Sequence, residues 1–239
     1  MFRSSKLATH AFIAFIAAAP LGCAAGHFSD AVKVEDKVSR TFKTPATPHL
    51  VVETFNGDVT VTVGQAGVVQ ATVHKWSTGS TREAADLGLV DIETDLAQDA
   101  DAIHIKAELA AQDIMGSRGA AVELQVPEGA VLDLRTNNGK IVATGKIGDL
   151  AGKTSNGPIE VREAAGKLQL STANGKIAIN GGSGKLQLRT NNGSVDIKSD
   201  KAIVDVQTDN GIITFTGSLP NGDHNFQNRN GKVSLTLPA

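Results

Sequence analysis

The chain of 239 residues is long enough for one large all-β domain. Its 23 basic and 25 acidic residues give a formal net charge of −2, which excludes the strongly basic surface that nucleic-acid binding requires. Aromatic residues make up only 4% of the chain and there are 25 glycines, so we expect frequent turns and a core of aliphatic side chains. Cys23 is the single cysteine, which excludes a disulfide within the chain.

Residues 1–22 have the pattern of an export signal of the lipoprotein type. Arg3 and Lys6 give a positive start, and an apolar run follows at 11–19 that is too short to span a bilayer. Leu21-Gly22-Cys23 then resembles the processing site of bacterial lipoproteins, in which the cysteine becomes the acylated N-terminus. The match departs from the usual pattern at Pro20, where leucine is common. Ordinary signal cleavage after the small residues Cys23-Ala24-Ala25 is the alternative.

Cys23 is the predicted lipid attachment site, and a lipid there would anchor the protein to a membrane without a spanning helix. Resemblance to Gram-negative lipoproteins implies that Ala24, a residue other than aspartate, favours the outer membrane. We therefore expect an exported protein of the cell envelope, as an outer membrane lipoprotein that faces the periplasm or the cell surface. Residues 23–47 are expected to be a tether and irregular N-terminal segment.

The segment 48–130 is expected to form irregular coils of a β domain that extends over 48–239. It opens with one degenerate copy of the repeat described below, formed by Leu50, Val52, Thr54, Asn56-Gly57, Val59 and Val61. Later segments at 68–76, 102–108 and 121–126 have the alternation of strands, and 81–89 is predicted to be a short helix or loop.

Residues 131–239 contain a regular repeat marked by the dipeptide Asn-Gly. The six asparagines are separated by 18, 18, 18, 18 and 20 residues, and they are Asn138, Asn156, Asn174, Asn192, Asn210 and Asn230. In the copy at 168–185, Leu168 and Leu170 alternate with polar residues before the Asn-Gly, and Ile177 and Ile179 do so after it. Each repeat therefore predicts two short strands and two turns.

Two folds fit this alternation. Asn-Gly between alternating runs is a strong hairpin signal, which would give an antiparallel β-meander. A parallel β-solenoid with about 18 residues per coil would instead stack identical slots about 4.8 Å apart. We favour the solenoid, because the slots repeat residue type as well as polarity. Stacking would join the asparagines into a structural ladder of inward-facing side-chain amides, with glycine supplying positive φ at the corner.

The run of T-x-N-G-x-[IV]-x-[IV] units, preceded by the segment Val-Glu-Leu-Gln-Val-Pro-Glu-Gly at 122–129, resembles the bacterial putative-adhesin β-strand-repeat family, a domain family of unknown function. The resemblance covers about residues 48–237. It implies a parallel β-solenoid fold in proteins that are commonly exported or membrane-attached.

Residues that could carry chemistry do not gather in the sequence. The histidines are not at zinc-ligand spacing, so we expect no metal and no cofactor. Glu160 and Asp196 lie on the same outward row two coils apart, roughly 10 Å, at the long edge of the separation in inverting glycosidases. No lysine, arginine or aromatic residue shares that row, so we interpret both carboxylates as solvated surface and predict no catalytic residues.

Three functions remain open from the sequence. The favoured one is a non-catalytic binding, adhesion or scaffolding module, anchored to the envelope membrane, with an envelope protein or a glycan as its partner. A carbohydrate-active β-helix enzyme is the second. The third is an accessory factor in envelope-stress signalling, which is implied only by resemblance to some family members.

Overall fold

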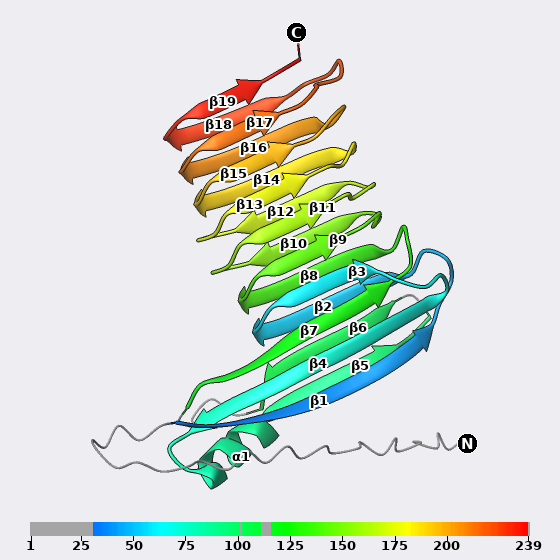
Figure 1. Cartoon of the computed structure of the whole chain (residues 1–239), viewed down its shortest axis with the longest axis vertical. Helices are drawn as coiled ribbons and strands as arrows, with labels where there is room; N and C mark the ends of the chain where they lie inside the picture. Colours follow the sequence, from blue (N-terminus) through cyan, green and yellow to red (C-terminus); the bar gives the residue numbers. More distant parts are fainter. Residues whose placement is uncertain (1–30, 101, 111–115, 239) are drawn as a thin grey trace, which may run out of the picture.

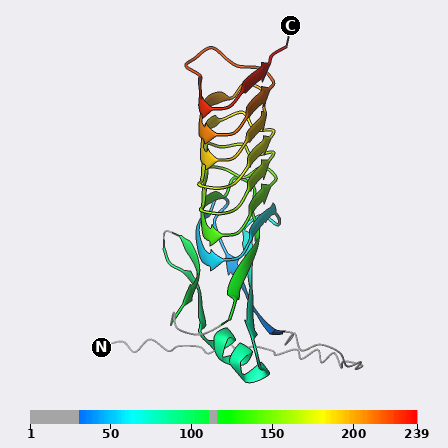
Figure 2. The ribbon, with the colours of Figure 1, turned by 90° about the vertical axis from the view of Figure 1, so that its left-hand side faces the viewer.

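The structure is a computed structural model, and it describes residues 31–100, 102–110 and 116–238. Nineteen strands and one short helix are formed by these residues. The strands make two sheets that face each other and share one core, and they rise as a stack of coils from a wider end that carries α1 (Figures 1 and 2). The architecture confirms the expected all-β parallel solenoid.

The solenoid is built from pairs of strands, one in each sheet. The first pair is β2 and β3, and the six regular coils follow it. The bounds are β2 (His49–Asn56), β3 (Val59–Val63), β8 (Val131–Asn138), β9 (Ile141–Thr144), β10 (Leu150–Thr154), β11 (Ile159–Arg162), β12 (Leu168–Thr172), β13 (Ile177–Asn180), β14 (Lys185–Asn192), β15 (Val195–Lys198), β16 (Ile203–Asn210), β17 (Ile213–Thr216), β18 (Asn225–Asn230) and β19 (Val233–Thr236).

The strands of successive coils pair in parallel with identical slots in register. Leu170 of β12 lies between Gly152 of β10 and Leu188 of β14, and Ile177 of β13 lies between Ile159 and Val195. Partners within the first five of the six regular coils are thus 18 residues apart. A meander would have paired the strands on either side of each Asn-Gly in antiparallel fashion, so this alternative is wrong.

The degenerate copy at residues 50–61 is a full coil of the solenoid. Strand β2 pairs in parallel with β8, so that Leu50 faces Leu132 and Thr54 faces Thr136. On the other side of this coil lie β6 and β7, which pair in parallel with β2 and β3. The chain therefore leaves the stack after β3, builds the wide end, and returns to add β8 directly onto β2.

The wide end is formed by the remaining elements, which pair in antiparallel fashion. Strand β4 lies between β1 and β7, and β5 borders β6. Their bounds are β1 (Val32–Lys43), β4 (Val68–Gly79), α1 (Arg82–Val90), β5 (Ile92–Gln98), β6 (Ile103–Leu109) and β7 (Arg118–Val126). Strands β4, β6 and β7 and helix α1 match the elements expected between 68 and 126 to within a few residues, whereas β5 was not among the expected strands.

The expectation of an irregular tether over 23–47 is wrong for residues 32–43, which form β1. This strand pairs along its whole length with β4. It buries Val34 and Phe42, whereas most of its other side chains are polar and exposed. That excess of polar residues hid the strand in the sequence. The rest of this expectation concerns residues 23–30, which lie outside the described residues, together with 31 and 44–47, which form no strand.

Helix α1 closes the wide end between the two sheets. The Thr81 side chain caps it by accepting a hydrogen bond of 3.2 Å from the Ala84 amide. At its other end, the side chain of Asp91 is buried in an ion pair with Arg118 at the start of β7. The helix is thereby fixed to the ten-stranded sheet.

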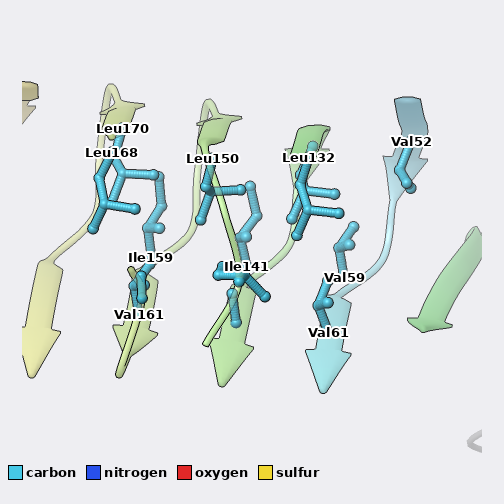
Figure 3. Close-up of a cluster of buried hydrophobic side chains, with 14 of the residues drawn as sticks. Val52, Val59, Val61, Leu132, Ile141, Leu150, Ile159, Val161, Leu168 and Leu170 are labelled. Atoms are coloured by element: carbon cyan, nitrogen blue, oxygen red, sulfur yellow. The ribbon is translucent and has the colours of Figure 1, made fainter. Parts of the chain in front are cut away.

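One aliphatic core runs through the whole stack. Valine, leucine and isoleucine side chains of both sheets interdigitate in layers, and those of successive coils lie above one another (Figure 3). The last coil differs, because His224 and Asn228 stand where earlier coils have aliphatic residues and threonine. The His224 ring accepts a hydrogen bond from the Val204 amide and also contacts the Pro220 carbonyl, so polar side chains finish the core at this end.

Candidate functional site

The six asparagines of the Asn-Gly corners form a continuous row of hydrogen bonds. From Asn156 onward, each side-chain amide donates to the side-chain oxygen of the asparagine one coil before, over 2.8 to 3.0 Å. The asparagines are exposed, however, and do not point into the core. The alternation that places leucine and threonine inside ends where the chain bends at the corner. The expectation of inward-facing asparagines is therefore wrong.

In every regular coil except the last, the inward polar residue is the threonine two positions before the asparagine. Thr172 is 3% exposed, and its hydroxyl donates a 3.0 Å hydrogen bond to the carbonyl oxygen of Gly157 in the preceding coil. The same bond recurs from Thr136, Thr154, Thr190 and Thr208. The threonine row satisfies carbonyl groups at the corner that would be costly to leave unpaired.

The corner glycines are needed because the coils approach closely. A Cβ atom at Gly175 would lie 2.0 Å from the carbonyl oxygen of Gly157, and the glycines of the other corners are similarly close to the coil before. Gly175 does not have a positive φ, and neither do Gly139, Gly157 and Gly193. The expectation that glycine supplies a positive φ is thus wrong at these corners. Glycine is required there because the backbones of successive coils are in contact.

The candidate functional site is a depression of about 330 Å³ on the outer face of the ten-stranded sheet. Its centre is Ala178, which pairs with Glu160 on one side and with Asp196 on the other. The alanine leaves room because its side chain is short. The depression is lined by Glu160, Val161, Arg162, Lys176, Ala178, Ile179, Asn180, Asp196 and Lys198.

Both carboxylates of the depression are in ion pairs. Glu160 contacts Lys140 at 3.0 Å and Arg162 at 3.7 Å, and Asp196 contacts Lys176. The positions that pair with Glu160 across the sheet contain no lysine or arginine, as the sequence indicates. The cations come from positions two residues earlier or later along the strands. Lys198 at the rim makes no ion pair with any residue that the structure describes. The depression thus presents both charges and the amide of Asn180 to a ligand.

This arrangement differs from that of an acid–base pair. A general acid keeps its proton when burial or a second close carboxylate disfavours the anion. The side chains of Glu160 and Asp196 are instead 30% and 39% exposed, and each contacts a cation. Within the described ranges, no three histidine, cysteine, aspartate or glutamate residues are grouped so that they could hold a metal ion.

The outer face of the nine-stranded sheet is a mixed polar surface. Arg135 contacts Glu53 at 3.1 Å and Asp133 at 2.8 Å, and Asn225 donates to Asp205 at 3.0 Å. Across neighbouring strands of this face, the residues that follow one another are Asp133, Ala151, Gln169, Gln187 and Asp205.

The predicted lipid attachment site, Cys23, lies outside the described residues, as do His10 and His27. The helix that the structure describes is too short to cross a membrane. His74 and His104 each contact one carboxylate, of Glu123 and Asp99 respectively, on the surface. These two histidines lie in different sheets, and among the described residues they belong to no group of three potential metal ligands.

A family model described as Toastrack DUF4097 matches residues 47–239. The chain belongs to this family. The match agrees with the resemblance seen in the repeat and with its extent. The match starts after β1, so that strand lies outside the residues that the family model matches.

Solved structures give distant similarities to this Toastrack chain. One is described as a putative adhesin of Bacteroides fragilis, with 11% identity and a TM-score of 0.47, covering 85% of this chain and 97% of that one. Another is described as a putative cell adhesion protein of Clostridium sporogenes, with 11% identity and a TM-score of 0.44, covering 86% of this chain and all of that one. The search of curated proteins gives no match.

Proposed function

We propose that this Toastrack protein is a non-catalytic binding or scaffolding module of the cell envelope, held at a membrane by a lipid on Cys23. The observation that carries the binding role is the depression over Ala178, an open polar surface in which both carboxylates are paired with cations. Stacked coils joined through backbone, threonine and asparagine hydrogen bonds make this surface rigid. A rigid surface lowers the conformational entropy lost on binding. The partner is a polar envelope protein or a glycan.

The anchor is supported by the apolar run at 11–19 and by Leu21-Gly22-Cys23. Replacing Cys23→Ser should release the protein from the membrane fraction, and the wild-type N-terminus should carry acyl chains by mass spectrometry. A mature N-terminus at Gly26, with unchanged fractionation of the variant, would instead indicate ordinary signal cleavage.

The binding role is tested by affinity capture from intact envelope, followed by mass spectrometry of the captured proteins and glycans. The wild-type protein is compared with a variant in which Ala178→Arg fills the depression, and with Gln169→Arg on the other sheet as the matched control. A partner lost by the first variant and kept by the second supports the site. Capture of a sensor or sigma-factor system would favour a role in envelope-stress signalling.

A carbohydrate-active enzyme is the second candidate, and Glu160 and Asp196 on either side of the depression favour it. The test is hydrolysis of envelope polysaccharides by the purified protein. Turnover that disappears in both Glu160→Gln and Asp196→Asn would establish the enzyme and overturn the non-catalytic proposal.

A further inference from the structure

Helix α1 exposes two apolar side chains at the wide end of the molecule. Its inner face packs through the buried residues Ala85 and Gly88. Leu87 is 66% exposed and Val90 is 79% exposed, more than any other large apolar side chain in the described residues. They are three positions apart and so lie on one side of the helix. No side chain among residues 31–100, 102–110 and 116–238 covers these two apolar side chains.

The chain enters the fold at this same end. Strand β1 begins at Val32, which pairs with Gly79 of β4, and α1 starts three residues after Gly79. Figure 1 shows the start of β1 and the helix together at the end of the stack opposite to β19. Val32 is nine positions after Cys23 in the chain. Even fully extended, nine residues span about 30 Å, so a lipid on Cys23 would keep this end close to the membrane.

The charges around α1 do not suit a basic contact with anionic headgroups. Arg82 is paired with Asp86 at 3.6 Å, and Lys33 of β1 is paired with Glu35. Glu83 and Glu93 are exposed beside them. Its cations are paired and further carboxylates are present. Binding of this end to a lipid surface is therefore favourable only through apolar contact. Leu87 and Val90 supply it, since exposed apolar side chains are stabilised at the boundary of headgroups and acyl chains.

We infer that α1 rests on the membrane to which Cys23 is anchored, with Leu87 and Val90 in the lipid interface. The inference rests on the proposed lipid anchor. It fixes the orientation of the molecule, because the solenoid axis then points away from the membrane. The coil of β18 and β19 is six steps from that of β2 and β3, which places it about 30 Å further out. The depression over Ala178 lies between them on the side of the stack.

The experiment uses the full lipidated protein, purified in detergent and reconstituted in vesicles of phosphatidylethanolamine and phosphatidylglycerol. Leu87→Cys and, as the matched control, Ile212→Cys receive the same environment-sensitive fluorophore. Ile212 is also apolar and is 50% exposed, but it precedes β17 near the other end of the stack. Circular dichroism of both labelled proteins verifies that they are folded.

Quenching by lipids that carry a doxyl group is then compared between the two positions. We expect several-fold stronger quenching at position 87 than at position 212, and no loss of it when the salt concentration is raised. Equal quenching, or stronger quenching at position 212, would overturn the inference. Quenching at 87 that salt abolishes would also contradict it, because the contact would then be electrostatic.

Flotation of the same vesicles separates this inference from the anchor itself. If the wild-type protein floats and Cys23→Ser does not, the anchor holds, and equal quenching at the two positions refutes only the orientation. If the wild-type protein stays at the bottom of the gradient, the anchor is refuted and the orientation is refuted with it.

Discussion

Asn56 and Asn138 are 82 positions apart in the sequence and are paired as residues of successive coils. The wide end of the molecule, apart from β1, is an excursion of the chain between these two coils, from β4 to β7. The asparagine row belongs to the later coils, because the amide of Asn56 donates instead to the carbonyl oxygen of Arg118 at 2.7 Å. The corner of the first coil is thus bonded to β7, and the solenoid and the wide end share a continuous hydrogen-bonded edge.

Removing a leucine from a middle coil should create a cavity that the stack cannot close. Leu170 is 1% exposed, and its Cδ2 atom fills the space above Gly152, which occupies the leucine slot of the coil before. Leu170→Ala should lower the free energy of unfolding by about 2–5 kcal/mol. Adding Gly152→Ala should recover about 1 kcal/mol, since its methyl group enters the vacated space. Urea unfolding measures both, with the exposed Gln169→Ala as a near-neutral control.

The threonine row should contribute more to stability, per residue, than the asparagine row. Thr172→Val keeps the shape of the side chain but leaves the buried carbonyl of Gly157 without its hydroxyl partner, at a cost of about 1–3 kcal/mol. Asn174→Ala removes two hydrogen bonds, to Asn156 and Asn192, at an exposed corner where water can replace them. We expect its cost to be about 1 kcal/mol or less. A larger effect from Asn174→Ala, in the same urea unfolding experiment, would contradict the assignment of inner and outer rows.

The corner glycine should tolerate no side chain at all. The Cβ atom of Gly175→Ala would meet the backbone of Gly157 at 2.0 Å, so the coils must separate, and we expect a loss of about 3 kcal/mol or more. Gly175→Asn distinguishes this reason from a positive φ, because asparagine tolerates positive φ better than alanine does. Equal damage from the two substitutions is expected in thermal unfolding. Rescue by asparagine would show that the backbone angle decides.

Much of the fold could be predicted because a solenoid repeats its own slots. Period, residue type and alternation placed Leu170 and Thr172 inside and Gln169 outside. The alternation failed at Asn174, because a bend resets which face a residue points to. Lys140 and Lys176 escaped notice beside Glu160 and Asp196, since each ion pair joins neighbouring coils diagonally, 20 positions apart. Strand β1 was missed because its partner β4 is antiparallel and outside the repeat.

Strand β1 should be part of the stable domain although it precedes the region that matches the family. Phe42 is 3% exposed, pairs with Val69 of β4, and belongs to the common core. Phe42→Ala should therefore lower the free energy of unfolding by about 3–5 kcal/mol, whereas the exposed neighbour Lys43→Ala should change it little. A shorter chain that starts at residue 47 should unfold at lower urea than one that starts at residue 31. If the two chains unfold at the same urea concentration, β1 is a dispensable edge strand, and the core ends at β4.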